Sequence, residues 1–149
     1  MILIFVSGSV VFPLQASNPR DPWMRALSQV ESGGNKDAIG KQGERSEYQL
    51  SYVVYKHHIG REGSYAEFIR YCHSDANVMY LVRTHAKWLA GMFINRTKRI
   101  PNNFEFYAMW NIGFHGFERR GFNIEKCPRI TRNAALKYEA LINQYNGKN

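Results

Sequence analysis

The sequence predicts one all-α domain of about six helices. Apolar residues recur with the helical period in several segments. Ser, Asp or Asn precedes these segments and Gly or Pro follows several of them, as is typical of helix ends. Beyond residue 17, no segment alternates apolar and polar residues as a half-buried strand does. A chain of 149 residues is long enough for a single domain with its own core.

The first predicted helix begins after Asp21-Pro22, a cap followed by the residue best suited to the first helical position. Its apolar face comprises Trp23, Ala26, Leu27 and Val30. The helix ends at residues 32–34, because paired glycines stop helices. Glu31 therefore lies at the C-terminal end of a helix with a buried face, where the helix dipole disfavours a carboxylate.

Five further helices are expected at residues 46–58, 65–72, 75–99, 103–110 and 131–145. The last four have predicted N-terminal caps, which are Ser64, Ser74, Asn103 and Thr131. Pro101 is expected to end the longest of them. The segments 33–43 and 113–128 contain several glycines and are expected to be loops.

The formal net charge of +8 suits a polyanionic partner, either nucleic acid, an anionic membrane surface or an anionic cell wall. A basic surface that only keeps the protein soluble is the alternative. The basic residues form neither a clustered helix nor a helix-turn-helix pattern, so no nucleic-acid partner is predicted.

The N-terminus resembles an export signal. Residues 2–14 are mostly apolar, too few to span a bilayer, and small residues follow at Ala16 and Ser17. We therefore expect a leader at residues 1–17 and a mature domain at 18–149 without a membrane span, located in the periplasm or cell envelope or secreted. No Lys or Arg precedes the apolar run, so a buried N-terminal strand is the alternative.

The cysteines and histidines suggest little chemistry of their own. Cys72 and Cys127 permit one disulfide in an exported chain, or else two buried thiols. The five histidines show no metal-ligand spacing with these cysteines. No metal and no cofactor is predicted.

Three ordered blocks carry the strongest functional signal. The first is Val30-Glu31-Ser32-Gly33-Gly34-Asn35, the second contains Gly43, Ser46 and Gln49, and the third is Ala108-Met109-Trp110-Asn111-Ile112-Gly113. They resemble the motifs of the soluble lytic transglycosylases in the lysozyme-like superfamily. The resemblance covers about residues 23–115 and implies a lysozyme-like fold in a monomer that binds the glycan strands of peptidoglycan.

By this resemblance Glu31 is the catalytic acid and base. Ser32 orients the acid and its loop, and Gln49 binds the substrate or positions the acid. The third block contributes Trp110, Asn111 and Gly113, through stacking, a bond to the cleft backbone and a close backbone approach.

The residue chemistry agrees, because glycoside cleavage needs a carboxyl group that stays protonated near neutral pH, and burial raises its pKa. The chain departs from the family pattern at Trp110, where a tyrosine is usual, and at Gly40, where a serine is usual.

Two alternatives follow from these departures. One is a hydrolase that uses a second carboxylate, for which Glu47 is the first choice, with Glu44 and Asp37 also available. The helix dipole alone also explains a glutamate at the start of a helix. The other alternative is a cell-wall-binding module that has the fold but no turnover.

Overall fold

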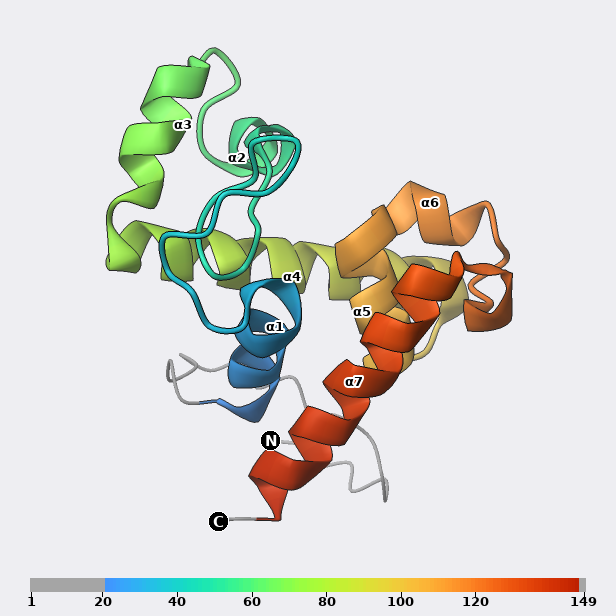
Figure 1. Ribbon diagram of the computed structural model, residues 1–149. Coiled ribbons are helices and arrows are strands. Elements are labelled where there is room, and N and C mark those ends of the chain that lie inside the picture. The colour runs from blue at the N-terminus through green and yellow to red at the C-terminus, as the bar shows by residue number, and fades with distance from the viewer. Residues whose placement is uncertain (1–20, 148–149) are drawn as a thin grey trace, which may run out of the picture.

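The computed structural model describes residues 21–147, which form seven α-helices and one short 3-10 helix, η1 (Figure 1). In chain order they are α1 (Pro22–Ser32), α2 (Tyr52–His58), α3 (Tyr65–Cys72), α4 (Asp75–Thr97), α5 (Asn103–Ile112), α6 (Phe114–Glu118), η1 (Ile124–Lys126) and α7 (Arg129–Asn146). The described residues contain isolated bridges but no strand, so the predicted all-α class is confirmed. The predicted leader lies outside the described residues.

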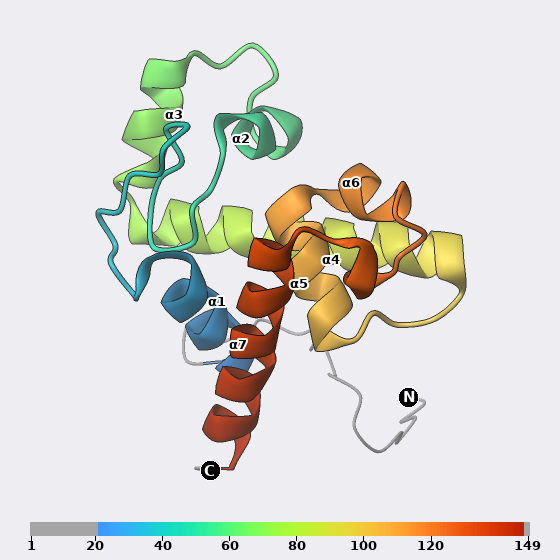
Figure 2. The ribbon, with the colours of Figure 1, turned by 45° about the vertical axis from the view of Figure 1, so that its right-hand side comes forward.

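Helix α4 crosses the molecule and organises the other helices around it (Figures 1 and 2). Helices α2 and α3 pack on its N-terminal half, whereas α5 and α6 pack further along it. Helix α7 packs against both α1 and α5. Residues 21–147 contain no helix with the length and apolar character needed to cross a membrane.

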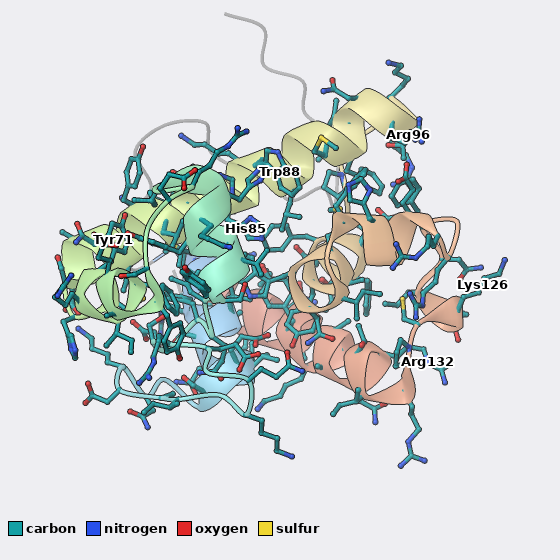
Figure 3. The ribbon with its side chains drawn as sticks, turned by 90° about the horizontal axis from the view of Figure 1, so that it is seen from above. Tyr71, His85, Trp88, Arg96, Lys126 and Arg132 are labelled. Atoms are coloured by element: carbon teal, nitrogen blue, oxygen red, sulfur yellow. The ribbon has the colours of Figure 1, made fainter. Side chains whose placement is uncertain are left out.

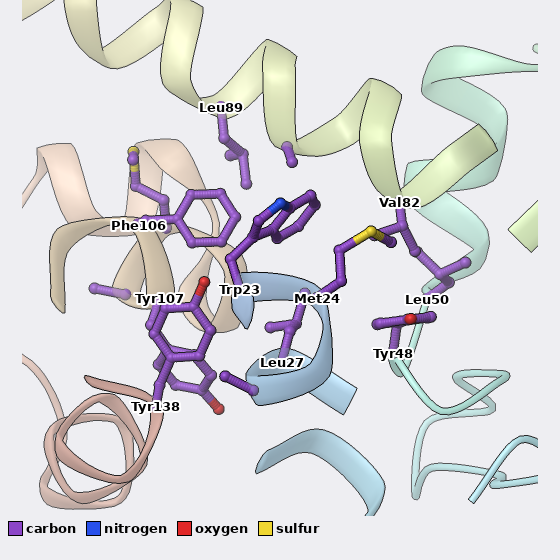
Figure 4. Packing of buried hydrophobic residues seen from close by; sticks show 14 of the residues in the cluster. Trp23, Met24, Leu27, Tyr48, Leu50, Val82, Leu89, Phe106, Tyr107 and Tyr138 are labelled. Atoms are coloured by element: carbon purple, nitrogen blue, oxygen red, sulfur yellow. The ribbon is translucent and has the colours of Figure 1, made fainter. Parts of the chain in front are cut away.

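The core forms where α1 meets α4, α5 and α7 (Figure 4). The predicted apolar face of α1 is buried through Trp23, Ala26 and Leu27, and Val30 packs at its edge. Met24, which the apolar pattern did not include, is also fully buried. Each such large side chain contributes about 1.5–3 kcal/mol when it leaves water. This burial holds α1, and the carboxyl group at its end, in a fixed position.

Local capping signals placed most helix starts correctly. Ser64 and Ser74 cap α3 and α4 as predicted, each accepting a hydrogen bond from a backbone N–H of the first turn. Two of the predicted N-terminal caps were wrong. Asn102 caps α5, one residue before the predicted Asn103, and α7 begins at Arg129, so that Thr131 lies inside the helix and is buried.

Two segments differ from the predicted secondary structure. Residues 46–51 do not begin a helix, because Arg45 pairs in antiparallel bridges with both Ile39 and Leu50 and folds the chain back on itself. In the second segment, the predicted loop at 113–128, Phe114 and Phe117 are buried and anchor the short helix α6. The first difference arises from pairing of residues five and six positions apart, and the second from burial of two aromatic side chains.

Candidate active-site cleft

A cleft of about 1000 Å³ lies between two walls of the molecule. One wall comprises the loop before α2 and part of α2, and the other comprises the end of α5, α6 and the start of α7. His85 and Trp88 of α4 line the space between them, and Figure 3 shows these two rings together in the middle of the molecule. This volume is at the upper end of the range for ligand pockets, about 300–1,000 Å³.

Glu31 lines this cleft because α1 ends immediately after it. Gly33 adopts the left-handed conformation with φ 68°, and its N–H donates to the carbonyl of Gln29. The N–H of Gly34 donates to the carbonyl of Ser28, which completes the helix end. Glu31 therefore lies half-buried on the last turn of α1, and the earlier turns of this helix pack in the core.

The surroundings raise the pKa of Glu31 above its ordinary value of 4.5. Burial is the largest cause, and the negative charge of Glu44 acts in the same direction. The hydroxyl of Tyr107 donates to Oε1 of Glu31 at 2.7 Å and opposes the rise, because it favours the charged form. Burial and the nearby Glu31 raise the pKa of Tyr107, so the phenol remains a donor. In protonated Glu31 the acidic proton therefore belongs on Oε2, since Oε1 accepts from Tyr107.

Tyr107 is the residue that sequence reasoning missed. The family pattern has a tyrosine at the position of Trp110, and Tyr107 lies three residues earlier in α5. Residues three apart share a helix face, so this spacing was the signal that could have identified it. Trp110 itself lines the cleft, with its ring 5.3 Å from that of His85.

The loop before α2 places Gln49 in the cleft wall. Ser46 and Gln49 have φ values of 69° and 51°, a conformation that side chains rarely adopt. The Gln49 amide donates through Nε2 to the carbonyl of Ser46 at 3.1 Å, which orients it. A Cβ on Gly40 would collide with the side chains of Glu44 and Gln49. The two closest atoms are the ends of these flexible side chains, so the crowding does not by itself account for glycine where the resembling family has serine.

The predicted second carboxylate, Glu47, does not line this cleft. It lines a separate pocket of about 510 Å³, where Ser28 Oγ donates to its Oε2 at 2.6 Å. Among the described residues, Glu44 is the acidic side chain that lines the cleft together with Glu31. The exposed Asp37 lines neither pocket.

Ser32 does not line the cleft. Its hydroxyl donates to the carbonyl of Glu47 at 2.9 Å and accepts from the N–H of Asn35 at 3.1 Å. It thereby ties the end of α1 to the loop that carries Gln49.

Asn111 and Gly113 line the cleft, but their contacts differ from those expected. Asn111 Oδ1 accepts from the Thr131 hydroxyl at 2.8 Å and links α5 to α7, in place of the expected bond to the cleft backbone. A Cβ on Gly113 would meet open space, so no close backbone approach explains this glycine. Its φ of 75° and ψ of 156° explain it, because this conformation is almost restricted to glycine.

The disulfide that Cys72 and Cys127 permitted is absent from the described structure, and both thiols are free. Cys72 ends α3, whereas Cys127 follows η1. Their chain neighbours Tyr71 and Lys126 lie at opposite ends of the molecule in Figure 3. Burial raises the pKa of Cys72 to about 11 and also raises that of Cys127, so neither is a reactive thiolate.

The structure thus brings five of the seven predicted site residues into one cleft: Glu31, Gln49, Trp110, Asn111 and Gly113. Comparison with protein-family models, curated proteins and solved structures finds no match for this chain.

Proposed function

We propose that the protein is a peptidoglycan-cleaving glycosidase of the lytic transglycosylase type, with Glu31 as general acid and then base. One observation carries this proposal. Glu31 combines partial burial in a large cleft, a pKa raised by that burial and a hydrogen bond from Tyr107. This combination suits a group that must donate a proton near neutral pH and then hold a negative charge.

In the first step Glu31 donates the proton on Oε2 to the glycosidic oxygen. The bond between that oxygen and the anomeric carbon breaks, and the oxygen leaves as a hydroxyl group. The sugar's own N-acetyl group stabilises the cationic centre, so no second carboxylate is required. As Glu31 becomes a carboxylate, the hydrogen bond from Tyr107 strengthens, because bonds to charged acceptors are about twice as strong as neutral ones.

In the second step the Glu31 carboxylate takes the proton of the muramyl 6-hydroxyl. The 6-oxygen attacks the anomeric carbon, closes a 1,6-anhydro ring and returns Glu31 to its protonated form. No water is consumed. The product is therefore lighter by one water than the corresponding hydrolysis product.

Hydrolysis is the second candidate, and the position of Glu44 favours it. Glu44 lines the same cleft, and its charge reaches Glu31. Its Oε2 accepts from the N–H of Gln42 at 3.0 Å, which leaves the other carboxylate oxygen available to activate a water. In this mechanism one carboxyl group protonates the glycosidic oxygen and the other activates the attacking water.

Mass spectrometry of peptidoglycan digests separates these mechanisms. We expect anhydro fragments from the wild-type chain, none from Glu31→Gln, and unchanged products from Glu44→Gln. Glu62→Gln is the matched control, because Glu62 is exposed and lies outside the cleft. Reducing-end fragments that disappear in Glu44→Gln would instead establish the hydrolase. A folded wild-type chain that yields no fragments would refute the enzyme and favour a wall-binding module.

A further inference from the structure

A cluster of five rings borders the cleft that Glu31 lines, and four of the five line it. It consists of His57 and His58 of α2, His85 and Trp88 of α4, and Trp110 of α5. The described residues contain no group of three potential ligand side chains that could hold a metal ion.

Two of these rings are joined by a hydrogen bond. Nε2 of His58 and Nδ1 of His85 lie 3.0 Å apart, so one proton lies between them. Burial, with smaller contributions from the neighbouring histidines, lowers the pKa of His85 to about 3. Burial and the nearby His57 lower the pKa of His58 as well. Both rings are therefore neutral around neutral pH.

The number of protons determines what this pair can offer to a ligand. Two neutral imidazoles carry two protons on four nitrogens, and one proton is used in the bond between them. The two outer nitrogens, Nδ1 of His58 and Nε2 of His85, therefore share one proton. When one of them is a donor, the other is an acceptor. A sugar hydroxyl, which both donates and accepts, suits either arrangement.

The position of His85 points to a ligand contact. His85 lines the cleft together with Glu31, whereas His58 does not. Its ring is stacked with Trp88 at 14° between planes and 5.7 Å between centroids, and Trp110 lies 5.3 Å away on a tilted plane. These neighbours fix the orientation of the ring. Among the described residues, no other hydrogen bond to the His85 ring is present, so Nε2 remains available.

We propose that His85 binds a hydroxyl group of the glycan beside Glu31, and that His58 is a positioning residue that sets which nitrogen of His85 carries the proton. This inference deepens the proposed function and rests on it for the identity of the ligand. It adds a specificity determinant that none of the three sequence blocks contains.

Binding of a β-1,4-linked tetramer of N-acetylglucosamine tests the proposal. The measurement uses the full chain with Glu31→Gln, so that cleavage does not interfere. His85→Phe keeps a ring between the tryptophans but removes both nitrogens. We expect the dissociation constant, measured by calorimetry, to rise about fivefold to tenfold, the loss of one hydrogen bond. His73→Phe is the matched control, since His73 is exposed and outside the cleft, and its affinity should not change.

A second set of variants separates positioning from simple packing. His58→Phe should raise the dissociation constant about threefold, and His58→Gln, whose amide can donate or accept, should restore it. The ¹⁵N shifts of the His85 ring report which nitrogen is protonated. They should move in His58→Phe and also when the tetramer binds to the parent chain. Ring shifts that do not respond to the tetramer would overturn the proposal.

The two proposals fail in different ways. Suppose that the wild-type chain cleaves peptidoglycan, but a folded His85→Phe variant of the Glu31→Gln chain binds the tetramer as tightly as that chain does. Only the role of His85 is then refuted. If tetramer affinity depends on His85 but the wild-type chain does not cleave peptidoglycan, only the proposed enzymatic activity is refuted. Absence of tetramer binding to the parent chain overturns the role of His85.

Discussion

Tyr107→Phe tests the chemistry of the cleft most directly. The substitution removes only the hydroxyl that donates to Glu31 at 2.7 Å and keeps the ring, which is almost fully buried. A hydrogen bond to a charged group contributes about 1.5–3 kcal/mol, and each 1.4 kcal/mol corresponds to a factor of ten in rate. We therefore expect kcat/KM on peptidoglycan to fall about 10-fold to 100-fold. Because Tyr107 lowers the pKa of Glu31, its removal should also shift the alkaline limb of the pH–rate profile upward.

The assay is turbidity loss of purified peptidoglycan between acid and alkaline pH, with circular dichroism as a check on folding. Tyr138→Phe is the matched control. Tyr138 is fully buried, its ring lies 5.4 Å from that of Tyr107, and its hydroxyl has no hydrogen-bond partner in the described residues. This control should keep wild-type activity. A folded Tyr107→Phe variant with unchanged kcat/KM and an unchanged pH profile would refute the role of the hydroxyl.

Three further predictions concern stability. The raised pKa of Glu31 means that its contribution to stability is complete below the ordinary value of 4.5 and is lost as pH rises through the folded value. Urea denaturation should therefore find Glu31→Gln more stable than wild type at about pH 7 and equal to it at about pH 4; equal stability at both pH values would contradict this. Glu105→Ala should cost about 2 kcal/mol in the same assay, because the nearly buried Glu105 binds half-exposed Arg99 through two hydrogen bonds and caps α5. A loss below about 0.5 kcal/mol would be too small for this geometry. Reductant should leave the melting temperature unchanged, since Cys72 and Cys127 are free thiols; a decrease would indicate a disulfide.

Prediction succeeded where structure depends on neighbouring residues in the chain. Ser64 and Ser74 could be assigned as caps because each accepts from an N–H three residues later. The end of α1 at Gly33 follows from the ease with which glycine adopts a positive φ. The position of Glu31 at the end of a helix with a buried face depended on these local signals alone.

Prediction failed where contacts outside the helical spacing decide the structure. The helix expected from residue 46 does not form there, because pairing of Arg45 with Ile39 and Leu50 outweighs local preference. Glu47 was the first choice for a second carboxylate, ahead of Glu44, yet the folded loop turns Glu47 toward Ser28 and places Glu44 in the cleft. A short polar loop has no apolar period, so its sequence does not indicate which of the two glutamate side chains points into the cleft.

The amino-acid sequence by itself determined the all-α class, most helix boundaries and the position of Glu31 on the last turn of α1. These depend on hydrogen bonds and side-chain periods within a few residues. Only the tertiary structure decided that Tyr107, 76 residues away, is the partner of Glu31, and that His58 and His85 share a proton in the same region. Such contacts depend on how α1, α2, α4 and α5 pack together, and packing is a property of the whole core.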